Sequence, residues 1–448
     1  MPEQRDAGLP PSTSPGAQPS GEARPLRRNR DFVLLWTGQA LSATGSSMTT
    51  VVYPLLALAV TNSATLAGVV GFAGMAAAAL VRLPAGVLAD RYPLKPLMVV
   101  PDLVRAAVTL WIVIVLLAGH VTLAQLLVVA VVASACGAVF ESAQTVAVRH
   151  VVPPEQLPQA LAQDAARGHL AGLVGQPLGG YLYGFAAAVP VLADAISYLA
   201  GAGLTALVRS PMRPSRAPGR LRTLWRDIPV GLRYVASSPF LRVTLACAVG
   251  FNVIFAGLTI AIIVSQSARS GAAFHIGTAL SIGAVGGILG ALAAPPLNKQ
   301  LSPAALVYLF GWTCCVALAL LGQVQNTYLV GALLAVIFFI ATPANATLFA
   351  AQIDITPPEL QGRVVSTAIL AAGIAAPAGP PLAGLLLDSI GQAPTFLLYA
   401  ALAAALTIVM HLSTSIRNMH RPGAGPQPAR PLAAEPLAAE HTPPAPPS

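Results

Sequence analysis

Twelve apolar segments dominate the sequence, and each is long enough to cross the hydrocarbon layer of a membrane. A helix that spans this layer needs about 20 apolar residues, because in lipid its backbone polar groups must bond within the helix. The sequence therefore predicts an all-α integral membrane protein with twelve transmembrane helices. The predicted segments are 33–60, 64–89, 96–118, 122–147, 159–186, 190–208, 240–267, 272–294, 302–322, 326–351, 363–388 and 392–413.

The low content of charge excludes several classes of protein. Only 9% of the residues are charged, whereas soluble domains carry about 25%, so most of the surface must face the lipid bilayer. The basic residues behind the net charge of +9 stand between apolar segments, which does not indicate nucleic-acid binding. The sequence has no phosphate-binding Gly-x-x-x-x-Gly-Lys loop, and its four cysteines lack metal-site spacing. We expect no enzyme, no cofactor and no metal.

The distribution of Lys and Arg predicts the orientation. Twenty of the 25 basic residues fall on one side of the predicted membrane, and only Arg269 lies in a loop on the opposite side. Cytoplasmic loops carry the excess of Lys and Arg, so both termini should be cytoplasmic. Arginine strongly outnumbers lysine, as in proteins from GC-rich genomes, and we expect a plasma membrane protein of a bacterium.

A constant offset of 204 residues relates the two halves of the chain. A repeat this long indicates two homologous halves, and six spans in each give both halves the same orientation. The sequence thus predicts two parallel six-helix repeats. The matches include Pro153, Pro154, Glu155, Gly175, Pro177, Leu178 and Gly180, which recur as Pro357, Pro358, Glu359, Gly379, Pro381, Leu382 and Gly384.

The segments and tails predict five regions. Two disordered cytoplasmic tails, rich in Pro and Ala or Ser, enclose two bundles and a basic cytoplasmic linker. Apolar residues of the linker recur at helical spacing, so it forms either an amphipathic helix on the membrane surface or an ordinary solvated connection. The regions are the tail 1–30, the N-terminal bundle 31–209, the linker 210–239, the C-terminal bundle 240–413 and the tail 414–448.

Gly86, Asp90, Arg91 and Lys95 join the second predicted span to the third. The stretch resembles the signature loop of the major facilitator superfamily, Gly-x-x-x-Asp-Arg followed by basic residues, although it lacks the usual Gly and Arg before Lys95. The resemblance implies a transporter fold in which Asp90 helps to hold the two halves together on the cytoplasmic side.

Three further stretches narrow the resemblance. They begin at Asp194 (DAISYL), Asp227 (DIPVGLRYV) and Pro358 (PELQGRV). They are similar to the drug and siderophore exporter branch of that superfamily, which includes macrolide-efflux and enterobactin-exporter relatives.

Small residues gather in the fifth span. Gly175, Pro177, Gly179 and Gly180 resemble the antiporter motif of the same superfamily, although Gln176 stands where that motif has Gly. Small residues let helices approach closely, so this surface and its repeat copy (Gly379, Pro381 and Gly384) either pack the helices or slide as the halves rock.

Charged residues inside spans are the sharpest functional signals, because each costs at least about 2.5–3.5 kcal/mol at mid-membrane. Asp102 and Arg105 are three residues apart, as are Asp164 and Arg167, so each pair can neutralise itself. Glu141 has no such partner. Counting 1.5 Å per residue places Arg82 and Arg105 at its level, and Arg82 is the expected partner because Asp102 already serves Arg105.

Two roles stay open for Glu141. It is structural if an arginine pairs with it in every state, and it couples protons if the pairing breaks as the halves move. Asp102 is the second candidate for proton coupling. Gln39, Gln144 and Asn252 are candidates for lining a central cavity, or else they join helices.

These features together predict a monomeric secondary transporter. It would export small amphipathic molecules and be driven by protons. An importer or uniporter of the same fold is the first alternative, and a membrane protein that binds or signals without transport is the second.

Overall fold

The computed structural model describes residues 26–212, 232–267, 272–417 and 419, and they contain helices and turns but no strand. The linker residues 213–231, Arg269 and most of both tails lie outside the described residues. The first half contains the short 3-10 helices η1 (Leu26–Arg28) and η2 (Pro154–Gln156), and the helices α1 (Arg30–Thr61), α2 (Ala64–Arg91), α3 (Leu94–Leu117), α4 (Leu123–Val151), α5 (Leu157–Tyr183) and α6 (Ala188–Ala206).

The second half repeats this order with one interruption. Its helices are α8 (Pro239–Ser267), α9 (Ala272–Gln300), α10 (Pro303–Leu321), α11 (Thr327–Asp354), α12 (Pro358–Ala375), η3 (Ala376–Ala378), α13 (Gly379–Ile390), α14 (Gln392–Leu412) and α15 (Thr414–Arg417).

Each predicted apolar segment corresponds to helix. Eleven helical stretches among the described residues are long and apolar enough to cross a membrane, and the twelfth segment is the less apolar α5. The segment 363–388 differs from the expectation of one helix, because it is divided into α12, η3 and α13. Pro377 and Pro380 lie at this break, where prolines remove hydrogen-bond donors from the helix.

Polar side chains cap the N-termini of several helices. Ser63 caps α2 by accepting from the backbone N–H of Leu66, and Asn29 accepts in the same way from Phe32. Thr122 and Gln125 form a reciprocal capping box at the start of α4. These bonds satisfy N–H groups that have no partner inside a helix, so the turns between spans can be short.

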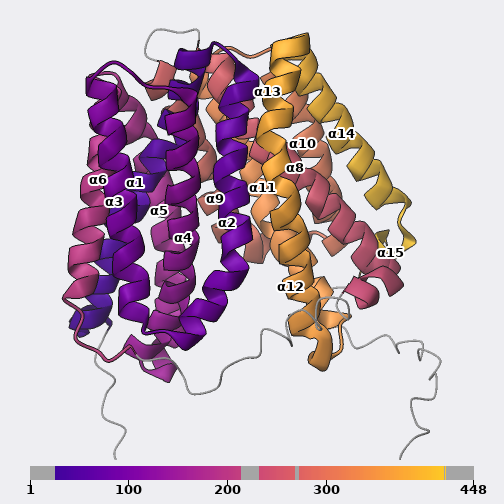
Figure 1. The fold of residues 1–448 in the computed structure, drawn as a ribbon. Helices are drawn as coiled ribbons and strands as arrows, with labels where there is room; N and C mark the ends of the chain where they lie inside the picture. The colour runs from indigo at the N-terminus through magenta and orange to yellow at the C-terminus, as the bar shows by residue number, and fades with distance from the viewer. Residues whose placement is uncertain (1–25, 213–231, 268–271, 418, 420–448) are drawn as a thin grey trace, which may run out of the picture.

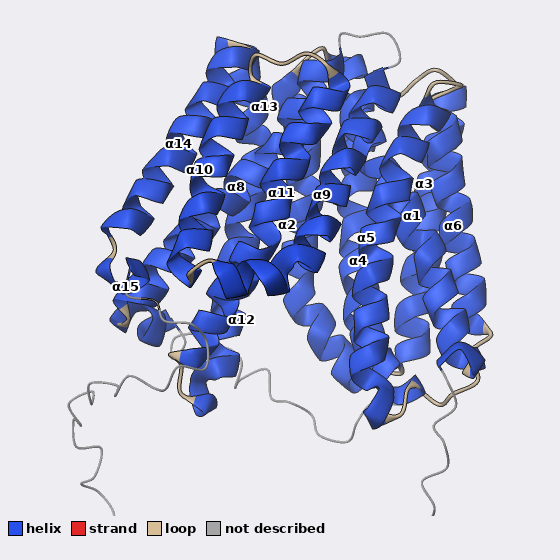
Figure 2. Ribbon diagram, turned by 180° about the vertical axis from the view of Figure 1, so that it is seen from behind, coloured by secondary structure: helices blue, strands red, loops and turns tan. Residues whose placement is uncertain are grey.

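The helices form two bundles that touch at one end (Figure 1). We call the end with the connections 62–63 and 184–187 and with Gly391 the closed end, and the end with 92–93, 152–156 and Val208 the open end. At the closed end α2 lies against α13 and α5 lies against α9. Toward the open end the two bundles diverge (Figure 2).

The two bundles have different cores. In the second half one continuous cluster of buried apolar side chains runs through α8, α10, α11 and α14. In the first half there are two separate clusters, one near the open end around Leu35 and Met98 and one near the closed end around Val52 and Ile112. Polar residues lie between them, and they form the candidate site.

Candidate functional site

A layer of polar side chains divides the core of the first half. On α1 this layer lies between Leu35 and Val52, and on α3 it lies between Met98 and Ile112. The ion pairs Arg82–Glu141, Asp102–Arg105 and Asp164–Arg167 belong to it. We call it the polar layer, and its members are Gln39, Ser46, Thr49, Arg82, Asp102, Arg105, Glu141, Gln144, Asp164, Arg167, Asp194 and Tyr198.

The exposed part of the layer is an ion pair between α2 and α4. Arg82 Nη2 lies 3.1 Å from Glu141 Oε2, and the two side chains are 60% and 64% exposed. Arg82, not Arg105, is thus the arginine beside Glu141 in this conformation. Because exposed ion pairs contribute little to stability, the contact can break and re-form at small cost.

A second group joins α1, α4 and α5. Arg167 pairs with Asp164 at 2.8 Å and also donates to Gln39 Oε1, which accepts from Gln144 as well. Gln144 donates in addition to Asp164. Gln39 and Gln144 are both buried, so the structure places these two cavity candidates inside a hydrogen-bond network in this conformation.

The third group is buried between α1, α3 and α6. The Arg105 guanidinium donates to Asp102 at 3.2 Å, to Ser46 at 2.9 Å and to the Tyr198 hydroxyl at 2.8 Å. Asp102 is fully buried, and its Oδ2 atom has no hydrogen-bond partner among the described residues. A carboxylate oxygen without a donor is costly in a dry interior, so this group is not fully satisfied.

Asp194 belongs to the same layer but has no basic partner within ion-pair distance among the described residues. Its carboxylate accepts from Thr49 at 3.0 Å and is only 1% exposed. Gly45 allows the approach of α1, because a Cβ there would lie 2.6 Å from Asp194 Oδ1. Asp194 and Tyr198 are one helical turn apart, which places both on the face of α6 that meets α1 and α3.

The layer contains one more acid than base. Its carboxylates are Asp102, Glu141, Asp164 and Asp194, whereas its basic side chains are Arg82, Arg105 and Arg167. An unpaired charge in an apolar interior is unfavourable. The layer can therefore hold a proton, and a proton is the simplest ligand that makes it neutral.

No hydrogen bond or ion pair between described residues joins the signature loop to the other half in this conformation. Asp90 is exposed and has no hydrogen bond or ion pair to a described residue, and a Cβ at Gly86 would meet nothing within 4 Å. Arg91 is also exposed, while Lys95 donates to the carbonyl of Val208 at 3.1 Å. The loop lies at the open end, where the halves are apart.

The glycine motif serves two kinds of contact. Gly175 and Gly179 pack against α1, and Gly379 packs against α8, all within their own half. Gly180 and Gly384 instead meet the other half, because a Cβ on Gly180 would lie 2.0 Å from Ala273 O and one on Gly384 would lie 2.2 Å from Ala64 O.

The prolines of the motif also lie at the contact between the halves. A Cβ on Gly277 of α9 would come within 2.7 Å of Pro177 Cα, and one on Gly68 of α2 would come within 2.9 Å of Pro381 Cα. The two related surfaces therefore build the two contacts of the closed end.

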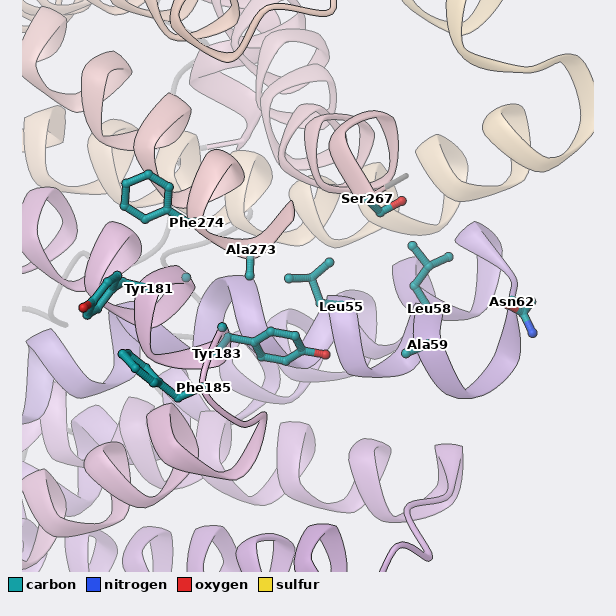
Figure 3. A pocket seen from close by; sticks show the side chains of 12 residues that line it. Leu55, Leu58, Ala59, Asn62, Tyr181, Tyr183, Phe185, Ser267, Ala273 and Phe274 are labelled. Carbon is teal, nitrogen blue, oxygen red and sulfur yellow. The ribbon is translucent and has the colours of Figure 1, made fainter. Parts of the chain in front are cut away.

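A pocket of about 800 Å³ lies beside the α5–α9 contact at the closed end (Figure 3). The aromatic side chains of Tyr181, Tyr183, Phe185 and Phe274 line it, together with Leu55 of α1.

Asn252, the third cavity candidate, lies on α8 and donates to the carbonyl of Ala248 in its own helix. No group of three or more His, Cys, Asp or Glu side chains in the described parts of the chain could hold a metal ion.

Sequence reasoning missed the role of two acids. Asp194 is a charged residue inside the predicted span 190–208 and begins one of the resembling stretches, and its four-residue spacing from Tyr198 indicates a shared helix face. Asp388 is the last residue of the predicted segment 363–388, and its contacts reach across to Ser63, Ala64 and Thr65. Those contacts join residues more than 320 positions apart, and no local pattern signals them.

Comparisons with known proteins agree with this architecture. Residues 35–368 match the sequence model of the Major Facilitator Superfamily. Among curated protein sequences, none matches significantly.

Several solved transporters have a similar fold. The nucleoside transporter NupG is 12% identical, with a TM-score of 0.69 over 87% of this chain and 99% of that chain. A bacterial homologue of the human lysosomal transporter Spinster, inward-facing and occupied, is 15% identical (TM-score 0.65; 85% and 95% covered). A bacterial homologue of the iron transporter ferroportin, also inward-facing, is 16% identical (TM-score 0.65; 85% and 98%). Identities this low show the fold alone.

Proposed function

Because this chain belongs to the major facilitator superfamily, whose members are membrane transporters, we propose that it exports small amphipathic molecules in exchange for protons. The resemblance of its motifs to the drug and siderophore exporter branch supports the direction and the substrate class. The transporter is expected to act as a monomer in a bacterial plasma membrane, with both termini cytoplasmic.

The observation that carries proton coupling is the excess acid of the polar layer. The layer contains four carboxylates and three guanidiniums, and its buried part lies between the open-end and closed-end apolar clusters. One proton makes the layer neutral, and its release leaves a buried negative charge. Protonation therefore changes the stability of any conformation in which the layer is dry.

The arrangement of the halves supports alternating access. With the orientation that the Lys and Arg distribution predicts, the closed end is extracellular and the open end is cytoplasmic. The exposed Arg82–Glu141 pair then faces the cytoplasmic side, where substrate enters during export. During export the exchanged proton enters from the extracellular side and leaves to the cytoplasm, so Glu141 is the proposed residue that releases it to the cytoplasm, with Asp102 and Asp194 buried behind it.

The experiment compares acids inside and outside the layer in proteoliposomes. Glu141→Gln and Asp194→Asn are tested beside Asp354→Asn, an exposed acid at the end of α11. Ethidium is the transported probe, and an internal pH dye reports proton movement. We expect Glu141→Gln to lose gradient-driven export but to keep exchange of labelled for unlabelled ethidium, and Asp354→Asn to behave as the parent does.

Each result has a distinct meaning. Proton-driven export that persists in both layer variants would refute coupling through the layer. If gradient-driven export is lost only in Asp194→Asn, the coupling residue is in the buried group and is not Glu141. If ethidium moves in the same direction as the protons, the protein is an importer and not an exporter.

A further inference from the structure

Asp388 at the end of α13 makes an unusually complete contact with the other half. Its carboxylate accepts from the backbone N–H of Ala64 at 3.0 Å and of Thr65 at 2.9 Å. It also accepts from the hydroxyls of Ser63 at 2.8 Å and Thr65 at 2.7 Å. Four hydrogen bonds thus join one side chain of the second half to the start of α2.

These bonds complete the start of α2. The first N–H groups of a helix have no partner inside it, and the helix dipole makes this end attractive to an anion. Leu66 N–H donates to Ser63 Oγ and Ala67 N–H donates to Ser63 O, while Asp388 accepts from the two N–H groups that precede them. Part of the cap of α2 is therefore supplied by the opposite half.

The contact between Asp388 and the start of α2 depends on hydrogen-bond geometry. No described basic side chain lies within ion-pair distance of Asp388, so hydrogen bonds and not a long-range charge pair hold the two helices. Hydrogen bonds weaken steeply with a small change in distance or angle. A modest rotation of one half against the other therefore releases all four together.

The related contact on the other side of the closed end has no such acid. Gly68 of α2 meets Pro380 and Pro381 of α13, as Gly277 of α9 meets Gln176 and Pro177 of α5. Gln176 and Pro177 are related to Pro380 and Pro381 by the repeat offset of 204. The residue 204 positions before Asp388 is Gly184, and Gly184 lines the aromatic pocket. Among the described residues, a carboxylate thus joins the α2–α13 contact, whereas the α5–α9 contact has the single hydrogen bond from the Ser281 hydroxyl to the carbonyl of Leu173.

We propose that Asp388 is the residue that fastens the closed end, and that α2 and α13 must part there in each transport cycle. The proposal rests on the alternating-access function above, because only a transporter needs this end to open. It assigns Asp388 a role in the conformational equilibrium and not in contact with substrate.

The test measures how often the closed end opens. Ser281 on α9 is buried and donates to the carbonyl of Leu173 across the α5–α9 contact at 2.9 Å. Ser281→Cys therefore places a conservative reporter between the halves, away from Asp388. Intact cells are treated with a membrane-impermeant maleimide, and the labelling rate is compared with and without Asp388→Asn. The same protein without Ser281→Cys gives the background from the native cysteines.

Asp388→Asn should accelerate labelling at position 281 by about tenfold or more, because hydrogen bonds to a charged group are worth more than those to a neutral one. Ser389→Ala is the matched control, since Ser389 is the next residue and bonds only within α13. Its labelling rate should equal that of the parent. His120→Cys, exposed in a connection at the same end, verifies that the reagent has access.

Thr65→Val provides a second variant from the other side of the contact. It removes one hydroxyl donor and keeps the backbone N–H, so a smaller acceleration is expected, and it should add little in the Asp388→Asn background. Equal labelling of the parent and Asp388→Asn would overturn the proposal, as would fully additive effects of the two variants. If Asp388→Asn does not fold, Thr65→Val alone decides, and an unchanged rate refutes the proposal.

Labelling requires neither substrate nor a proton gradient. A failure of proton coupling in the proteoliposome experiment would therefore leave this measurement intact. Conversely, unchanged labelling would reject the role of Asp388 without affecting the polar layer.

Discussion

The two halves have the same helix order but opposite kinds of interior. In the first half, charged and hydroxyl side chains separate two apolar clusters. In the second half, one apolar cluster is continuous, and it includes Phe251 and Phe310, whose ring centroids are 4.8 Å apart. Cys314 occupies on α10 the position that Arg105 occupies on α3, counted from the first residue of each helix.

This difference shows that two halves with the same helix order can have different interiors. The helix arrangement needs apolar surfaces and small residues at the contacts, and the described core of the second half is one continuous apolar cluster. The polar layer of the first half is therefore an addition that the fold itself does not demand. Groups that a fold does not need, and that cost free energy to bury, point to function.

The largest expected effect is the loss of Arg105. Arg105→Met leaves the buried carboxylates of Asp102 and Asp194 without their nearest cation, and removing one partner of a buried ion pair costs about 3–5 kcal/mol. The free energy of unfolding is measured by titration with sodium dodecyl sulfate in mixed micelles. Cys314→Ala, the matched change in the second half, should cost only about 1 kcal/mol.

A second substitution checks the origin of that loss. If the uncompensated charge is responsible, Asp102→Asn should restore part of the stability of Arg105→Met. Similar losses for Arg105→Met and Cys314→Ala would show that the two interiors are equivalent in energy, and the comparison would fail.

Close packing in the second half should have an intermediate effect. A Cβ on Gly286 of α9 would lie 2.2 Å from Ala335 O of α11, whereas one on Gly287 would lie 3.7 Å from its nearest neighbour. Gly286→Ala is expected to destabilise by about 1–3 kcal/mol through overpacking, and Gly287→Ala should stay within about 0.5 kcal/mol of the parent. The same micelle titration measures both.

The ratio of protons to transported substrate in these glycine variants tests whether the second half takes part in coupling. If the second half only packs, Gly286→Ala lowers stability but leaves the ratio of protons to substrate unchanged. A changed ratio would place coupling in the second half as well.

The smallest effect is expected for the exposed ion pair. Arg82→Gln combined with Glu141→Gln removes both charges of a pair whose side chains are 60% and 64% exposed, and such pairs contribute about 0–1 kcal/mol. The double variant should therefore unfold almost as the parent does while gradient-driven export is lost. A large loss of stability would make this pair a structural element like the buried ones.

The spans could be predicted from sequence because one physical constraint sets their length. Lipid admits only helices of about 20 apolar residues, so α1 to α6, α8 to α11 and α14 begin and end close to the predicted segments. The division of the eleventh segment at η3 was not predicted. Prolines occur inside several helices that continue, such as Pro54 in α1 and Pro84 in α2, so a proline alone does not locate a break.

The candidate site could be predicted where the geometry of single helices sets the position of a side chain. The Asp102–Arg105 and Asp164–Arg167 pairs follow from three-residue spacing on one helix, and the placement of Arg82 near Glu141 follows from counting residues along helices. The contacts of Asp194 with Thr49, and of Asp388 with Thr65, depend on how helices distant in sequence face each other. That information lies in the packing and not in any segment of the chain.

The low apolar content of α5 has a consequence for biosynthesis. Alone, this helix would carry Asp164 and Arg167 into lipid, where each charge costs at least about 2.5–3.5 kcal/mol on insertion scales. Its partners Gln39 and Gln144 lie on α1 and α4, which leave the ribosome earlier, and only residues 184–187 separate it from the more apolar α6. The fifth span is thus suited to enter the bilayer as a hairpin with the sixth, onto helices that are already in place.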